Sequence, residues 1–265
     1  MAAVFAALKQ RSRAALIPFI TAGDPFPGAT VEVMHALVEA GADLIELGMP
    51  FSDPMADGPV IQHADERALR NKVGVGGILR WAREFRERDA ETPLVLMGYL
   101  NPIAIRGIER FAREAVEAGV DGVLVVDCPI EEDATLQPLR DAGLQRILLA
   151  APTTSDARLA RAIEAAEGYL YYVSFAGVTG AAKLSTGDIA QRVGAIRERA
   201  KVPVAVGFGI KDASSAAAVA AFADAVVIGS ALVGSLAHAN DAGDACRRAR
   251  DFLAPIRSAL DGTRA

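Results

Sequence analysis

Short apolar runs and longer amphipathic segments alternate along this chain about eight times. The apolar runs occupy residues 16–20, 44–47, 93–97, 122–126, 146–150, 169–174, 202–206 and 225–228. They lack a regular alternation of polar and apolar residues, which is typical of parallel strands that are covered on both faces. Between several runs, apolar residues recur every three or four positions and predict helices over residues 31–39, 78–88, 108–118, 156–166 and 189–200.

Glycines mark the points where these predicted helices end. Ala-Gly-Ala-Asp at residues 40–43 and Ala-Gly-Val-Asp at residues 118–121 each fit a helix that stops on glycine and turns into the next strand. Similar joints lie at residues 141–143 and 222–224. The tail predicts a last helix over residues 242–253 and a short continuation after Pro255, because proline interrupts helices.

The unbroken series of strand-helix units predicts an α/β fold, a single (β/α)8 TIM barrel. We expect one domain over residues 1–265, with a short N-terminal helix before the first strand. A doubly wound open sheet is the alternative. The number of strands and the absence of a GxGxxG motif after the first strand favour the barrel.

Composition excludes several classes of protein. The net charge of −5 gives no electrostatic argument for nucleic-acid binding. No window of about 18 apolar, uncharged residues predicts a membrane span, and the N-terminal apolar run is too short for a signal peptide. Cys128 and Cys246 stand outside CxxC or CxxH patterns, and the histidines are far apart. We therefore expect no metal site and a reducing, cytoplasmic location.

Polar residues gather where the predicted strands end, which is the face where barrels of this class place their active sites. Glu46 lies near the end of the second strand, and Asp53 and Asp57 follow in a proline-rich loop. A carboxylate on a buried strand is costly unless it is paired or used in chemistry. Glu46 is therefore either a salt-bridged structural residue or a catalytic one.

Glycines also follow the last three strands. They are Gly177 and Gly180 after the sixth, Gly207 and Gly209 after the seventh, and Gly229 with Ser230 after the eighth. Glycine lets backbone N–H groups approach an anion, and loops after strands 7 and 8 often bind phosphate in such barrels. Ordinary turns explain each pair alone, but three adjacent pairs favour a phosphate site. Phe19, Tyr99, Tyr171 and Phe208 would suit an aromatic group nearby, or fill the barrel core.

Four segments together resemble the α subunit of tryptophan synthase. They span residues 17–25, 45–62, 171–180 and 207–210, and the likeness extends from the first strand to the last. The resemblance implies retro-aldol cleavage of indole-3-glycerol phosphate to indole and glyceraldehyde 3-phosphate. It implies that Glu46 is the general acid and base and that Asp57 engages the indole N–H. Burial between Ile45 and Leu47 would raise the pKa of Glu46 toward neutrality.

The resemblance also implies the remaining binding residues. The substrate-binding residues would be Phe19, Ile61, Tyr99, Tyr171 and Thr179, and the phosphate-binding residues Gly180, Phe208, Gly209, Gly229 and Ser230. Tyr172 would point away from the site.

A partner is part of the same expectation. The family works with a pyridoxal-phosphate (PLP) β subunit in an α2β2 assembly, so this chain itself needs no cofactor; Lys183 is a weak candidate for PLP. Apolar residues near the barrel mouth would suit an interface or ordinary loop packing: Pro54, Met55, Pro102, Pro129 and Ile130. Three alternatives remain open, which are a stand-alone indole-releasing lyase, a different phosphate-binding barrel, and a catalytically silent barrel that activates a partner.

Overall fold

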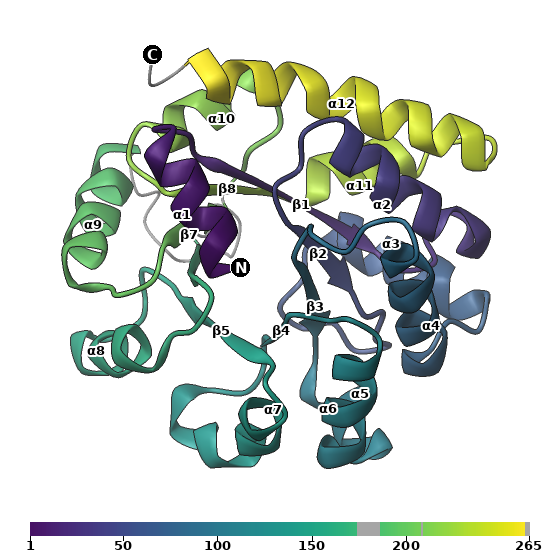
Figure 1. Ribbon diagram of the computed structural model, residues 1–265, viewed down its shortest axis with the longest axis horizontal. Coiled ribbons are helices and arrows are strands. Elements are labelled where there is room, and N and C mark those ends of the chain that lie inside the picture. Colours follow the sequence, from purple (N-terminus) through teal and green to yellow (C-terminus); the bar gives the residue numbers. More distant parts are fainter. Residues whose placement is uncertain (174–185, 208, 263–265) are drawn as a thin grey trace.

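Eight parallel strands close into a barrel in which each strand pairs with its neighbours in chain order and β8 returns to β1 (Figure 1). This computed structural model describes residues 1–173, 186–207 and 209–262. The strands are β1 (Ala15–Thr21), β2 (Ile45–Gly48), β3 (Leu94–Gly98), β4 (Gly122–Val125), β5 (Gln145–Ala150), β6 (Leu170–Val173), β7 (Val204–Gly207) and β8 (Ala225–Ile228). The predicted (β/α)8 barrel is confirmed, and each strand lies within a few residues of its predicted place.

Helices surround the barrel (Figure 1). The α-helices are α1 (Ala2–Gln10), α2 (Thr30–Glu39), α3 (Pro59–Arg70), α4 (Val75–Arg86), α5 (Leu100–Arg106), α6 (Ile108–Glu117), α7 (Gln137–Asp141), α8 (Asp156–Ala165), α9 (Thr186–Arg199), α10 (Ala213–Ala220), α11 (Ser230–Leu236) and α12 (Ala242–Gly262). Two 3-10 helices join them, η1 (Pro27–Ala29) and η2 (Ile130–Leu136). Gly41, Gly119 and Gly143 have positive φ just after helices, as the glycine joints predicted.

The predicted break at Pro255 is wrong, because α12 continues through this residue to Gly262. A proline inside a helix costs about 3 kcal/mol. Ile256 and Leu260, which follow it, are buried against the rest of the core. Each buried aliphatic side chain contributes roughly 1.5–3 kcal/mol. Their burial offsets the lost hydrogen bond and keeps the helix continuous.

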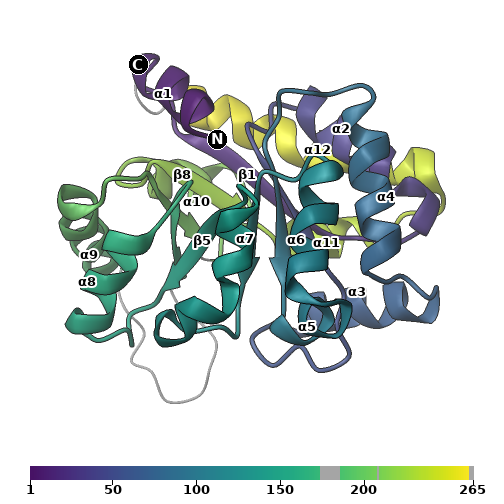
Figure 2. The same ribbon diagram turned by 60° about the horizontal axis from the view of Figure 1, so that its bottom comes forward.

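The strands are buried on both faces. Alternate residues such as Ile17, Val95 and Ala205 fill the interior of the barrel, together with residues of α1. The intervening residues, for example Leu16 and Leu96, pack outward against the helices. Both sets are apolar, which explains the absence of a two-residue hydropathy period. Figure 2 shows α1 at the opposite end of the barrel from α5.

Four carboxylates tie the strands together at the end of the barrel where the strands begin. Each precedes an even-numbered strand, accepts a hydrogen bond at 2.8–3.0 Å from a backbone N–H of the preceding strand, and pairs with a helix arginine at 2.6–3.1 Å. We call these the rim clamps; they are Asp43 (Leu16 N–H, Arg257), Asp121 (Leu94 N–H, Arg86), Glu167 (Arg146 N–H, Arg140) and Asp224 (Val204 N–H, Arg197). They fix the register of neighbouring strands at the end of the barrel opposite the loops that follow the strands.

Within the described residues, none of the helices is long and apolar enough to cross a membrane. The same part of the chain holds no group of three or more His, Cys, Asp or Glu side chains arranged to bind a metal ion.

Candidate active site

Glu46 lies inside the barrel and is completely buried. Ile45 and Leu47 on either side point outward into the helix layer, so the alternation along β2 turns Glu46 inward. Burial raises the pKa of this carboxyl to about 7, while a hydrogen bond from Tyr169 acts in the opposite direction. Near neutral pH the group can therefore both donate and accept a proton, which is the property required of a general acid-base residue.

Tyr169 is a neighbour of Glu46 that the sequence did not reveal. Its phenol donates a hydrogen bond to Oε1 of Glu46, and both side chains are fully buried. Among the described residues, Oε2 of Glu46 has no hydrogen-bond partner. One signal was available, because Tyr169 stands two residues before Tyr171 and strand residues two apart face the same side. The resemblance points only to Tyr171, and Tyr169 lies inside an apolar run.

Asp57 lies in the loop between β2 and α3. Tyr99 donates a hydrogen bond to its carboxylate, with 2.6 Å between Oη and Oδ2, and accepts one from the Ala56 N–H at 3.0 Å. Burial raises the pKa of Asp57, and the bond from Tyr99 partly opposes this. The ring of Tyr99 also stacks against Phe51, with 5.2 Å between centroids. Tyr99 therefore anchors the whole loop as well as the carboxylate.

A second buried acid, Asp65 of α3, stands behind this loop. It accepts a hydrogen bond from the Phe51 N–H at 3.4 Å. Burial, followed by the charge of Asp57, raises the pKa of Asp65 to about 7. Asp24, after β1, is buried as well, but Arg67 forms a two-bond ion pair with it at 2.6 and 3.0 Å. Asp65, unlike Asp24, has no arginine partner among the described residues.

Tyr171 faces the interior, as expected, and Tyr172 faces the outer helix layer. The pKa of Tyr171 is raised well above its usual value, by burial first and then by the charges of Glu46 and Asp57. The phenol therefore lies within electrostatic range of both acids. Gly207 of β7 permits this position, since a Cβ atom there would stand 2.1 Å from the Tyr171 hydroxyl oxygen.

Phe19 and Ile61 form a small apolar cluster with Ala64 and Val233, against which Met97 packs. Phe19 lies directly across from Glu46 in the β1–β2 pairing. A Cβ atom on Gly48 would come within 2.5 Å of the Phe19 ring, so that ring covers the backbone just beyond Glu46. Three of the predicted substrate-binding residues, Phe19, Ile61 and Tyr99, are thereby brought to the same end of the barrel as Asp57.

The predicted phosphate residues fall at neighbouring strand ends. Gly209 follows β7 with a φ of +50°, and Gly229 follows β8 as the residue before α11. Ser230 is the first residue of α11, as predicted for a serine at a helix start. Because β7 and β8 are paired, these backbone groups converge on one side of the mouth. Thr179, Gly180 and Phe208 lie outside the described residues.

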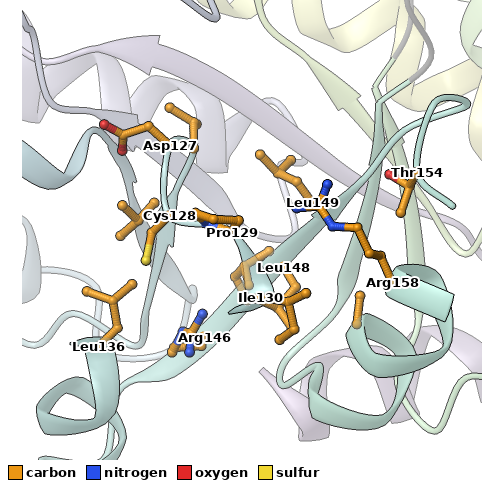
Figure 3. A pocket seen from close by; sticks show the side chains of 14 residues that line it. Asp127, Cys128, Pro129, Ile130, Leu136, Arg146, Leu148, Leu149, Thr154 and Arg158 are labelled. Atoms are coloured by element: carbon orange, nitrogen blue, oxygen red, sulfur yellow. The ribbon is translucent and has the colours of Figure 1, made fainter. Parts of the chain in front are cut away.

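Asp127, which lies two residues after β4, has a structural role. Its carboxylate accepts a hydrogen bond from the Leu100 N–H at 2.7 Å, at the start of α5. A cavity of about 270 Å³ opens beside it, between β4, β5 and α8 (Figure 3). It contains neither Glu46 nor Asp57, and its two arginines are already paired, Arg146 with Asp133 and Arg158 with Glu131. We therefore assign this cavity no part in the chemistry at Glu46.

Comparison with known proteins shows the family. The sequence profile described as "Tryptophan synthase alpha chain" matches residues 5–259. The chain belongs to the tryptophan synthase alpha chain family. A tryptophan synthase alpha chain of Xylella fastidiosa (strain 9a5c) is 59% identical over 261 residues, which are 98% of this chain and 97% of the relative. One of Xanthomonas campestris pv. campestris (strain 8004) is 59% identical over 263 residues, with the same coverage of both chains.

The fold agrees with that membership. The crystal structure of tryptophan synthase subunit alpha from Legionella pneumophila str. Paris superposes with a TM-score of 0.92 at 44% identity, over 98% of this chain and 97% of the other. Every candidate residue from Phe19 to Ser230 lies inside the segment that the family profile matches. The matched segment therefore includes both acids, both inward-facing tyrosines and the strand ends that carry glycines.

Proposed function

We propose that this chain is the lyase of tryptophan biosynthesis that cleaves indole-3-glycerol phosphate, with Glu46 as general acid and base and Asp57 as the anion at the indole nitrogen. The observation that carries the proposal is the inward-facing, fully buried Glu46, whose pKa of about 7 suits both proton transfers. Membership in the tryptophan synthase alpha chain family supplies the substrate and the reaction.

The first step adds a proton to carbon 3 of the indole ring. Protonated Glu46 donates it, and the ring becomes an indoleninium cation with its positive charge centred on nitrogen. Asp57 accepts a hydrogen bond from that N–H, so its negative charge lies where positive charge develops. Tyr99 holds the Asp57 carboxylate and its loop in place for this contact.

The second step breaks the bond between carbon 3 and the side chain. Ionised Glu46 removes the proton from the hydroxyl on the adjacent carbon, and an aldehyde forms there. The electron pair of the broken bond returns to the ring and restores neutral indole. Glu46 ends protonated, as it began, so the cycle consumes no net proton and requires no oxidant. General acid-base help of this kind contributes roughly 10²–10⁴-fold in rate.

The phosphate would bind at the ends of β7 and β8. Gly209, Gly229 and Ser230 lie there, and Ser230 opens α11. Exposed backbone N–H groups at such strand ends suit a dianion. We include Gly180 and Phe208 in the phosphate site and Thr179 in the substrate site by resemblance. Phe19, Ile61, Tyr99 and Tyr171 would surround the indole ring and the cleaved bond.

A β subunit is the proposed partner, in an α2β2 assembly. Met55, in the loop after β2, is 85% exposed, and Ile105, on α5 after β3, is 80% exposed. Both follow strand ends on the mouth side, and large exposed apolar side chains on one rim suit a protein interface. This favours the subunit over the stand-alone lyase. We assign no cofactor to this chain, place PLP on the partner, and propose one barrel domain that works in the cytoplasm.

Indole formation from indole-3-glycerol phosphate tests the proposal. We would compare wild type, Glu46→Gln and Asp57→Asn, each alone and with a β subunit. Wild-type turnover that rises with the β subunit and is lost in Glu46→Gln would support the assignment. Turnover that survives Glu46→Gln would overturn the mechanism. A wild-type chain that forms no indole but activates its partner would instead favour the silent barrel.

A further inference from the structure

The N-terminal helix α1 lies at the end of the barrel opposite the mouth (Figure 2). Phe5 and Leu8 of α1 are buried among the inward-facing strand residues, so the helix closes this end of the interior. Phe5 contacts Tyr169, with 6.1 Å between the ring centroids and 50° between the ring planes. This separation lies within the range of favourable aromatic pairs, so Phe5 supports the Tyr169 ring in its observed position.

Tyr169 connects that contact to the chemistry. Its ring touches Phe5, and its hydroxyl donates to Oε1 of Glu46. Because no other described group bonds the carboxyl, this phenol alone decides which oxygen is held and which remains open. The open oxygen is Oε2, which is buried and has no described partner.

We propose that Tyr169 is a positioning residue that holds Glu46 with Oε2 directed toward the substrate, and that α1 holds Tyr169 through Phe5. The inference rests on the proposed function of Glu46 and assigns a catalytic consequence to the helix that closes the far end of the barrel. Neither Phe5 nor Tyr169 touches the substrate, and both act through the Glu46 carboxyl.

The hydrogen bond from the Tyr169 hydroxyl stabilises the carboxylate form of Glu46. Removal of that hydroxyl should therefore raise the pKa of Glu46. In Tyr169→Phe we expect kcat to fall about 10-fold with KM within about twofold, since positioning affects the transition state more than substrate binding. The alkaline limb of the profile of kcat/KM against pH should move upward by about one pH unit. A residue that served only for packing would leave that limb in place.

Tyr172→Phe is the matched control. Tyr172 lies on β6, which Tyr169 directly precedes, and it is as buried as Tyr169. It faces the outer layer, and its hydroxyl has no hydrogen-bond partner among the described residues. It should keep both the wild-type rate and the wild-type pH profile.

Phe5→Leu and Phe5→Ala test the role of the helix. Both variants keep the Tyr169 hydroxyl but remove the aromatic contact that supports its ring. We expect kcat to fall about threefold in Phe5→Leu and further in Phe5→Ala. The alkaline limb of the profile of kcat/KM against pH should move in the same direction as in Tyr169→Phe. Phe111→Leu, a buried phenylalanine of α6 in the outer layer, controls for general loss of stability. It should lower the melting temperature without moving the limb.

The outcomes separate the two levels of the proposal. If Glu46→Gln abolishes indole formation while Tyr169→Phe keeps the wild-type rate and pH profile, the positioning role is wrong and the proposed function stands. If the Phe5 variants lose activity only as melting temperature falls, with the limb unmoved, the role of α1 is wrong. If Glu46→Gln remains active, the proposed function itself fails. All variants are measured as the full chain, alone and with the β subunit.

Discussion

The hydroxyl of Tyr99 bridges the backbone and the side chain of one loop, since it accepts from the Ala56 N–H and donates to the Asp57 carboxylate. Tyr99→Phe would leave the N–H unpaired and free the carboxylate. We expect kcat/KM to fall about 10-fold, equivalent to about 1.4 kcal/mol, because a partly buried hydrogen bond to a charged group has been lost. Steady-state indole formation measures this. An unchanged kcat/KM would mean that the loop is held by its other contacts.

The buried acid Glu46 should make folding stability depend on pH. Its pKa is about 7 in the folded chain and 4.5 when exposed. Between these values the folded state binds more protons than the unfolded state, so the free energy of unfolding falls as pH rises from 4.5 to 7. The stabilisation is fully present below 4.5 and lost above about 7, a change of about 3 kcal/mol.

Glu46→Gln should remove that contribution. Glutamine keeps an oxygen that can accept from Tyr169 but cannot ionise, so the variant should be more stable than wild type at pH 8 and similar to it at pH 4.5. Urea unfolding at both pH values provides the measurement. Equal stability of the two proteins at pH 8 would show that Glu46 titrates in the folded state as it does in water.

Asp65 offers a second, separable pH effect. Asp65→Asn retains an oxygen for the Phe51 N–H and removes the negative charge that faces Asp57. Because Asp65 is protonated below its pKa of about 7, it carries no charge where Asp57 ionises, so the variant should leave both limbs of the profile of kcat/KM against pH in place. Above pH 7 the variant lacks a buried anion, so urea unfolding at pH 8 should show a higher free energy of unfolding than for wild type. A shift of the alkaline limb would assign Asp65, rather than Glu46, to the ionisation that ends activity.

Gly207→Ala should damage the site without changing any polar group. The added Cβ would meet the Tyr171 hydroxyl at 2.1 Å, so ring or strand must move. We expect at least a 10-fold loss of kcat/KM and about 1–3 kcal/mol lower stability, as for other overpacked cores. Gly194→Ala on α9 is the control, since nothing lies within 4 Å of its Cβ position. It should stabilise the helix by up to about 1 kcal/mol.

Much of the fold could be predicted from the sequence. The apolar runs marked the strands, and positive-φ glycines such as Gly41 and Gly119 marked the joints, because each signal arises from a few neighbouring residues. The continuation of α12 through Pro255 could not be predicted, since it depends on burial of Ile256 and Leu260 by distant parts of the chain. Local propensity favours a break there, and tertiary packing overrides it.

Some residues of the candidate site could also be predicted from the sequence, and others could not. Glu46 stood out because a carboxylate on a buried apolar strand is costly unless it is paired or used, and the role of Asp57 followed from the family resemblance. Tyr169 did not, because tyrosine in an apolar run is ordinary and its partner lies 123 residues away. Asp65 was missed for a related reason, since a charged residue on a helix usually faces water and only the fold shows that it is buried.

The rim clamps divide the eight strands of the barrel into four pairs. Each joins an odd-numbered strand to the joint before the next even-numbered one, so β1 with β2, β3 with β4, β5 with β6 and β7 with β8 are four interlocked pairs. A piece cut between the members of a pair loses the acceptor for one of its strand N–H groups, while a piece cut between pairs keeps it. The natural module for fragmenting, permuting or recombining this chain is therefore two strands long.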